Sequence, residues 1–78
     1  METLIEYIAK GLVDDPDKVE VQAGQSSDPG LDVYELSVGE GDVGKVIGRQ
    51  GRTARALRAV VRAAGARAGR RATVEILD

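Results

Sequence analysis

Apolar residues recur at helical spacing near the start of the chain and predict a helix over residues 3–12. Thr3 is followed three residues later by Glu6, which is the capping-box pattern expected where a helix begins. Gly11 and the segment 14–16, which holds two aspartates and a proline, end this helix. The apolar residues on its buried side are Leu4, Ile5, Ile8, Ala9 and Leu12.

Alternating apolar and polar residues predict three strands further along the chain. The first contains Val19 and Val21, and the second covers residues 34–38. Residues 25–30, with the sequence QSSDPG, have the composition of a turn between these strands. The last strand covers residues 73–77. The residues expected to face inward in the second and last strands are Tyr34, Leu36, Val38, Val74 and Ile76.

Two helices joined by a short segment with a glycine at each end lie between the second and last strands. Asp42 is expected to cap a short helix that ends with Val46 and Ile47. Residues 48–51 interrupt this helix, and a longer helix follows over residues 53–66. The stripe of the longer helix that is expected to face the sheet consists of Ala54, Leu57, Val61 and Ala64.

The resulting order, α-β-β-α-α-β, predicts a single α+β domain over residues 1–78. Hydrophobic residues make up 42% of the chain and charged residues 31%, which is typical of a globular protein. The absence of cysteine excludes disulfides and thiolate metal sites, and we expect no cofactor and no metal. The start of the chain lacks a signal-peptide pattern, and no segment is long and apolar enough to cross a bilayer. We therefore expect a cytoplasmic protein that does not bind membranes.

The net charge of −2 conceals an uneven distribution along the chain. Residues 1–42 carry 11 acidic and two basic side chains, a net charge of −9. Residues 43–78 carry nine basic and two acidic side chains, a net charge of +7. Such asymmetry is typical of proteins that bind polyanions, but a basic face that balances an acidic one within the same fold would also produce it.

The longer helix carries two further stripes besides its core face. Its arginines, spaced three, three and four residues apart, lie on one side with no acid among them, and the row begins beside the segment 48–51. A solvated helix face is the alternative to a binding surface. The small apolar stripe is explained by core packing or by self-association. The arginines are Arg52, Arg55, Arg58 and Arg62, and the small residues are Ala56, Ala59 and Ala63, with Val60 beside them.

Two patterns in the sequence resemble phosphate-binding motifs, but each lacks a residue that the motif requires. Residues 39–44 match G-x-G-x-x-G, but the acid expected about 20 residues later is replaced by alanine and arginine. Residues 39–45 nearly match a P-loop, but Val46 stands where the magnesium-binding hydroxyl is needed. Both loops would also bring Glu40 and Asp42 toward a phosphate.

The segment Gly48-Arg49-Gln50-Gly51 has a more informative setting. Its glycines allow a tight reversal and leave room for a sugar-phosphate backbone. The helix that follows offers free backbone N–H groups and the positive end of its dipole to an anionic oxygen. Lys45, Arg49 and Arg52 add positive charge around this segment. A plain helix–turn–helix connection is the alternative, and the surrounding cations favour the binding function.

Residues 44–54 (GKVIGRQGRTA) resemble the signature of KH-domain RNA-binding proteins, and the element order resembles the type II form of that fold. Residues 7–14 and 16–19 extend the resemblance to the small single-domain bacterial KH proteins of the KhpA type. The resemblance implies a three-stranded sheet with helices packed on one face, and a groove that clamps about four nucleotides of single-stranded RNA. Residues 67–71 and the sheet would form the second wall. The expected RNA-binding residues are Lys45, Val46, Ile47, Gly48, Arg49, Gln50, Gly51, Arg52 and Arg55.

The same resemblance implies a homodimer, or pairing with a larger protein that carries its own KH domain. It also implies roles in RNA chaperoning, post-transcriptional regulation and control of cell shape. Gln50 departs from a more basic loop, and Tyr7 and Tyr34 are the only aromatic residues, so we expect modest affinity and weak base preference. The residues alone do not separate RNA from single-stranded DNA; the resemblance favours RNA.

Two other classes of function compete with RNA binding. An enzyme is disfavoured because the chain has no histidine or cysteine, which are the commonest general base and a common nucleophile. A protein-interaction module with little intrinsic nucleic-acid binding is the stronger rival, because the alanine stripe suits it. Such a module would not require Arg49 or the arginine row.

Overall fold

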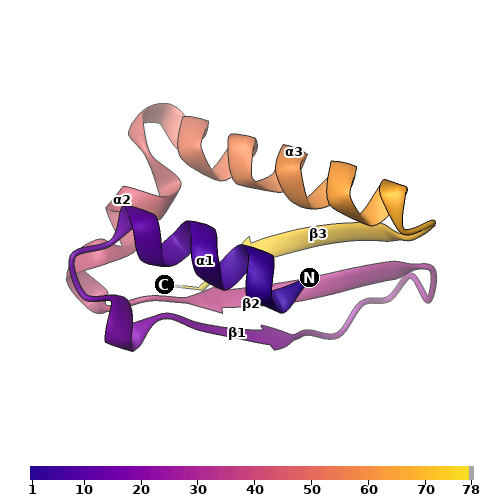
Figure 1. Cartoon of the computed structure of the whole chain (residues 1–78), viewed down its shortest axis with the longest axis horizontal. Coiled ribbons are helices and arrows are strands. Elements are labelled where there is room, and N and C mark those ends of the chain that lie inside the picture. Colours follow the sequence, from indigo (N-terminus) through magenta and orange to yellow (C-terminus); the bar gives the residue numbers. More distant parts are fainter. Residues whose placement is uncertain (78) are drawn as a thin grey trace.

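A computed structural model describes residues 1–77 and contains a three-stranded mixed sheet (Figure 1). Strand β2 (Leu31–Ser37) lies in the centre, antiparallel to β1 (Glu20–Ala23) and parallel to β3 (Arg71–Ile76). The register pairs Leu36 with Val21 on one side and with Ile76 on the other. All three residues therefore point to the same face of the sheet.

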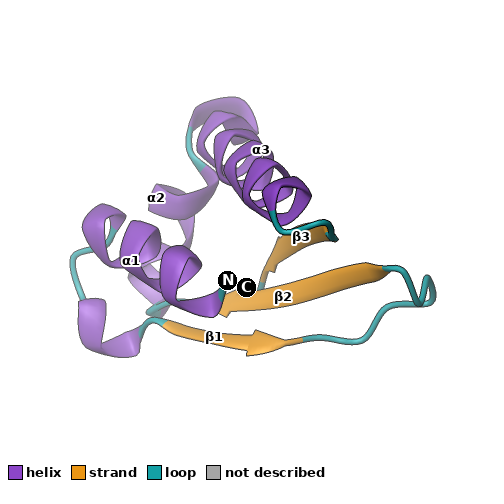
Figure 2. Ribbon diagram, turned by 45° about the vertical axis from the view of Figure 1, so that its right-hand side comes forward, coloured by secondary structure: helices purple, strands orange, loops and turns teal. Residues whose placement is uncertain are grey.

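The helices all lie on that one face (Figure 2). They are α1 (Glu2–Leu12), α2 (Val43–Ile47) and α3 (Arg52–Arg67). Helices α2 and α3 form the crossover that returns the chain for parallel pairing of β3 with β2, which a tight hairpin cannot achieve. The predicted α+β order α-β-β-α-α-β, with the helices on one face of the sheet, is confirmed.

The core lies between the sheet and the helices, and its members come from every layer. Helix α3 buries Ala54, Leu57, Val61 and Gly65, so three of the four predicted stripe residues are confirmed. Ala64 is only half-buried, and Gly65 takes the innermost position because α3 approaches the start of β3 closely there. The largest fully buried side chains are Ile5, Leu36, Val46, Val61 and Val74.

One predicted helix cap is wrong, and a second occupies the predicted N-cap position without making the capping bond. Helix α1 begins at Glu2, with the Ile5 N–H bonded to the Met1 carbonyl at 3.1 Å, so Thr3 lies within the first turn. Met1 packs against the core and thereby fixes an earlier start. Asp42 does precede α2, but its carboxylate makes no capping bond to that helix. It instead accepts hydrogen bonds from the turn after α1, where it is buried.

The strand boundaries also differ from the sequence pattern. Strand β3 begins at Arg71, two residues before the predicted segment 73–77, because Leu31 of β2 pairs with Arg71. Strand β2 likewise begins at Leu31 and ends one residue before Val38, which still packs against the core. Pairing across strands thus extends the sheet beyond the segments whose local alternation predicted strands.

The close approach of α3 to β3 predicts opposite effects for two Gly→Ala substitutions within helices. A Cβ atom on Gly65 would lie 3.0 Å from both the Ala72 Cβ and the Arg70 carbonyl oxygen, so Gly65→Ala should destabilise the fold by about 1–3 kcal/mol. A Cβ atom on Gly11 meets nothing within 4 Å, so Gly11→Ala should stabilise the fold by about 0.5–1 kcal/mol through helix propensity. Urea unfolding measures both changes, and equal effects would contradict the proposed close packing.

Candidate nucleic-acid interface

The turn between α2 and α3 is exposed and has an unusual backbone. Gly48, Gln50 and Gly51 all have positive φ, at 76°, 58° and 74°. At Gly48 a Cβ atom would lie 2.2 Å from the Thr53 Oγ1 atom and 2.9 Å from the Thr53 backbone nitrogen, so only glycine fits there. The backbone therefore forms a fixed, nearly bare loop in which the Arg49 and Gln50 side chains are exposed.

This loop presents main-chain donors at the start of α3. Turn η3 (Arg49–Gly51) is closed by a 3.1 Å hydrogen bond from the Gly51 N–H to the Gly48 carbonyl. Gly51 occupies the N-cap position of α3 and provides no side-chain cap, and the first turn of α3 contains no acid. The Gly51 and Arg52 N–H groups are bonded to the Gly48 and Arg49 carbonyls, so an anion would meet the later N–H groups of that turn and the positive end of the helix dipole.

The cations near the loop fall into two groups. Arg49, Arg52 and Arg55 are exposed and make no ion pair with any residue in the described range 1–77. Arg52 makes only a long contact, 3.4 Å, with the Gln50 amide oxygen. Lys45, by contrast, pairs with Asp14 and lies 3.5 Å from an Asp42 oxygen. The arginines are thus the mobile positive charges, whereas Lys45 is engaged within the fold.

Asp42 joins α2 to the turn that follows α1. Its carboxylate oxygens accept hydrogen bonds from the backbone N–H groups of Asp14 at 3.2 Å and Asp15 at 3.0 Å. Burial raises the pKa of Asp42, but the two N–H donors and the Lys45 ammonium lower it by more, so the net pKa lies below its ordinary value. The side-chain hydrogen bond to Asp14 raises the pKa of Lys45. This cluster fixes α2, and hence the start of the loop, relative to α1.

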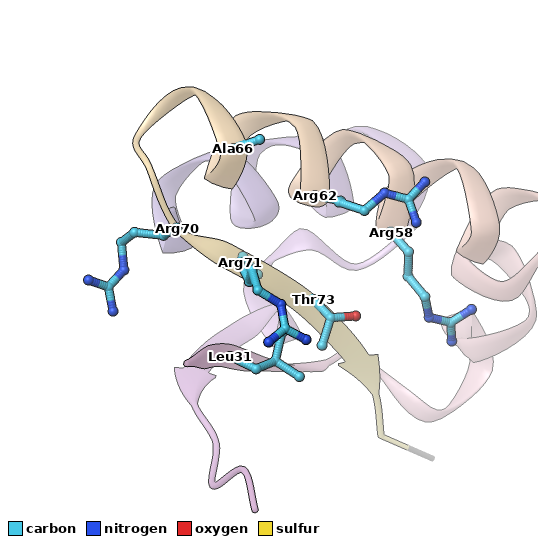
Figure 3. Close-up of a pocket in the computed structure, with 8 residues that line it drawn as sticks. Leu31, Arg58, Arg62, Ala66, Arg70, Arg71 and Thr73 are labelled. Atoms are coloured by element: carbon cyan, nitrogen blue, oxygen red, sulfur yellow. The ribbon is translucent and has the colours of Figure 1, made fainter. Parts of the chain in front are cut away.

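A cleft of about 310 Å³ runs between the second half of α3 and the outer edge of β3 (Figure 3). Arg58 and Arg62 extend from α3 on one side, and Arg71 lies beside Leu31 on the other. The Arg58 Nε donates to the Val74 carbonyl oxygen at 3.4 Å, so α3 contacts the free edge of β3. The remaining lining residues are Ala66, Arg70, Ala72 and Thr73.

The structure brings most of the predicted site residues together near the loop, but they differ in exposure. The loop and Arg52 and Arg55 lie at the start of the arginine row whose later members line the cleft. Val46 is fully buried, whereas Ile47 is half-buried. The arginine row could have extended the predicted set to Arg58 and Arg62. No local signal distinguishes Asp42 from the other acids, because its partners lie 27 and 28 residues away.

Within the part of the chain that the structure describes, no helix has the length and apolar character required to span a bilayer. The same residues contain no cluster of three side chains suited to holding a metal ion.

The family model for the KhpA/KhpB KH domain matches residues 2–76. This chain belongs to that family. The RNA-binding protein KhpA of Halalkalibacterium halodurans is 52% identical, with both chains covered in full. The proteins of the same name from Streptomyces coelicolor and Clostridium acetobutylicum are 49% and 47% identical, over 100% and 99% of this chain and 92% and 100% of theirs. No solved structure matches significantly.

The predicted resemblance to KhpA-type KH proteins is thereby confirmed, and it covers nearly the whole chain. The expectation that the chain is not an enzyme also agrees with a family whose members carry the name of RNA-binding proteins.

The Asp42 cluster predicts a dependence of stability on pH. Because the folded-state pKa of Asp42 is lowered, its contribution is fully present above about pH 4, the ordinary range of an aspartate, and is lost as the pH falls through the folded-state pKa. Asp42→Asn should therefore lower the thermal midpoint at pH 7, by on the order of 5 °C, with a smaller difference from the parent protein at acid pH.

Asp17→Asn provides the matched control, because Asp17 is exposed and makes no hydrogen bond or ion pair with another described side chain. Thermal unfolding followed by circular dichroism between pH 7 and pH 3 measures both variants. An Asp42→Asn protein as stable as the control at pH 7 would show that the buried carboxylate does not hold the two turns together.

Proposed function

We propose that this protein binds single-stranded RNA by gripping its sugar-phosphate backbone at the loop Gly48–Gly51. The observation that carries the proposal is the loop itself: an exposed, nearly bare backbone at an acid-free helix start, followed by a row of arginines that leads into a cleft. The name of the H. halodurans relative, RNA-binding protein KhpA, supports RNA as the ligand.

The arrangement assigns different tasks to the loop and to the cleft. A phosphate at the loop would accept hydrogen bonds from main-chain N–H groups, with Arg49 and Arg52 neutralising its charge. The strand would then follow the arginine row toward the cleft, where Arg58 and Arg62 face the edge of β3. About four nucleotides of backbone is the span that KH domains clamp in this way.

The same geometry favours weak base preference. Tyr7 is 78% exposed on α1, and Tyr34 is half-buried in β2, and neither lines the cleft beside α3 and β3. Bases therefore have no aromatic platform there and would contact small residues such as Ala66 and Thr73. A backbone-directed, base-tolerant grip suits an RNA chaperone or post-transcriptional regulator that meets many transcripts.

The double substitution Arg49→Asp and Gln50→Asp tests the proposal. It places two carboxylates where a phosphate would lie, and it should abolish RNA binding through like-charge repulsion. The fold should persist, because both side chains are exposed and aspartate tolerates the left-handed conformation of position 50, where φ is 58°. Fluorescence anisotropy with a labelled oligouridylate measures the affinity.

The control changes the same charges at a distance from the loop, with Lys18→Asp and Gln22→Asp, both on the exposed surface near β1. This control should bind RNA nearly as well as the parent protein at moderate salt. An oligodeoxyuridylate of the same length tests DNA as the ligand. RNA affinity that survives the loop substitutions would instead support the protein-interaction module.

We also propose that the protein forms a homodimer, or a heteromer with a larger KH-containing protein, through the stripe of Ala56, Ala59, Val60 and Ala63. Val60 is 44% exposed, and the three alanines are exposed as well. Small residues in such a row let two helices approach closely. Val60 is two residues from both Arg58 and Arg62, so it points about 160° away from them around the helix, whereas Ala59 lies about 60° from Arg62; a partner centred on Val60 would therefore leave the cleft open.

Val60→Asp tests this pairing, since a carboxylate in the centre of an apolar interface should dissociate it. We expect light scattering to show a monomer for Val60→Asp and a dimer for the parent protein, with RNA affinity reduced through lost avidity. Leu77→Asp is the control, because Leu77 is an apolar side chain of similar exposure, 40%, outside the stripe. Identical masses for parent and Val60→Asp over a range of concentrations would contradict the proposal.

A further inference from the structure

The two arginines at the start of β3 are engaged by carboxylates, unlike those near the loop. Arg70 donates from both Nε and Nη2 to the two oxygens of Asp32, at 2.7 Å for the Nη2 bond. Arg71 donates from Nη1 to an oxygen of Asp28 at 2.8 Å. Both arginine side chains remain about two-thirds exposed, at 65% and 68%. The charge of both guanidinium groups is therefore locally neutralised, with that of Arg71 beside Leu31 in the cleft and that of Arg70 extending outward from the far end of the cleft (Figure 3).

The parallel pairing of β2 with β3 brings these acids to the arginines. Leu31 pairs with Arg71, which places Asp32 beside the start of β3 and Asp28 in the turn just before β2. Asp28 also accepts a 2.9 Å hydrogen bond from the Gly30 N–H, which fixes its carboxylate in that turn. The strand register and the turn thus place each acid within reach of its arginine.

The bonds also shift the proton affinities of these groups. The hydrogen bond from Arg70 lowers the pKa of Asp32, and the same bond raises the pKa of Arg70. The backbone hydrogen bond from Gly30 makes the largest contribution to lowering the pKa of Asp28, and the hydrogen bond from Arg71 lowers this pKa further. Both acids are therefore charged at neutral pH.

We propose that Asp28 and Asp32 limit the affinity for RNA by occupying Arg71 and Arg70 in the free protein, and that RNA phosphates exchange with these carboxylates on binding. The inference rests on the proposed function, because it needs a strand that passes along the cleft. A phosphate can replace a carboxylate on a guanidinium because both present two oxygens to its fork of donors. The two aspartates are thus affinity-determining residues that need not touch the RNA.

This exchange divides the interface into two parts. The arginines near the loop have no carboxylate partner among the described residues, whereas the two arginines at the far end of the cleft are already bound to carboxylates. Arg49, Arg52 and Arg55 have no ion partner within residues 1–77 and accept a phosphate without giving up a bond. At Arg70 and Arg71 a phosphate must displace the carboxylate already bound, so the net increase in charge neutralisation is small. A strand would therefore be held firmly at the loop and weakly at the far end of the cleft.

The test is the double substitution Asp28→Asn and Asp32→Asn. Asparagine keeps the side-chain oxygen that accepts the Gly30 N–H, so the turn should be retained while both charges are lost. Affinity for a labelled oligouridylate should rise by about threefold to tenfold, the range that two exposed ion pairs can oppose. The slope of log Kobs against log salt concentration should steepen by about 0.7 for each added phosphate neutralised.

Two further proteins separate local competition from a general loss of negative charge. Asp17→Asn with Asp15→Asn removes two charges in and next to turn η1 (Pro16–Lys18), which lies at the opposite end of the sheet from the start of β3 (Figure 1), and should change affinity little. In a protein with Arg70→Gln and Arg71→Gln, the Asp28→Asn and Asp32→Asn changes should no longer increase affinity. Circular dichroism confirms that each variant is folded.

An affinity that does not rise, a rise equal to that of the Asp15/Asp17 control, or a rise that persists without the two arginines would each overturn the inference. These outcomes are distinguishable from failure of the proposed function. That function is tested by binding to the parent protein and by its loss in Arg49→Asp with Gln50→Asp. The parent protein can bind RNA at the loop whether or not the aspartates compete at the far end.

Discussion

The parallel pairing of β2 with β3 is the constraint on which the rest of the structure depends. Two parallel strands need a crossover connection. The chain therefore leaves the sheet after β2, passes through α2, reverses direction at the loop, and returns along α3 to β3. That path places the glycine loop at one end of α3 and the start of β3 at the other. The candidate interface is therefore the crossover itself: its turn, its outward arginines and the strand edge beside it.

The uneven charge of the sequence is resolved by a few specific ion pairs and not by general neutralisation. Asp42 and Asp14 engage Lys45, and the acids around the start of β2 engage Arg70 and Arg71. The arginines nearest the loop remain without an acidic partner within residues 1–77. One part of the basic segment is thus balanced by acids within the fold, and the part near the loop is not balanced by any described residue, as the proposed binding of a polyanion requires.

Much of the fold could be predicted because its signals are local. Helical spacing, strand alternation and the loop at residues 48–51 each depend on neighbours a few positions apart. The errors arose where a distant partner decided the outcome. Asp42 has the spacing of a helix cap, but backbone donors 27 and 28 residues earlier bind its carboxylate. Arg71 lies in a segment whose composition is typical of a loop, but its pairing with Leu31 makes it the first residue of β3.

The site residues named from the sequence gather at the loop, and the later arginines that line the cleft, Arg58 and Arg62, were not among them, for the same reason. The loop is a contiguous segment, whereas the cleft combines α3 with the edge of a strand that begins beyond it. Lys45 shows the same limit within the motif. Its position next to the loop predicted a contact with phosphate, but in the structure its ammonium group is paired with two acids.

The proposed grip by main-chain donors would have consequences for how such a small domain works. Backbone N–H groups cannot read bases, and the cleft lacks an aromatic side chain, so a single groove gains little from any particular sequence. Affinity must then come from charge and from the number of grooves engaged. Val60 points about 160° away from Arg58 and Arg62 around α3, whereas Ala59 lies only about 40° from Arg55, so a second copy centred on Val60 would keep clear of the cleft and lie close to the start of the arginine row. Pairing would convert the second encounter with one RNA strand into an intramolecular event, which raises avidity without any new base-specific interaction.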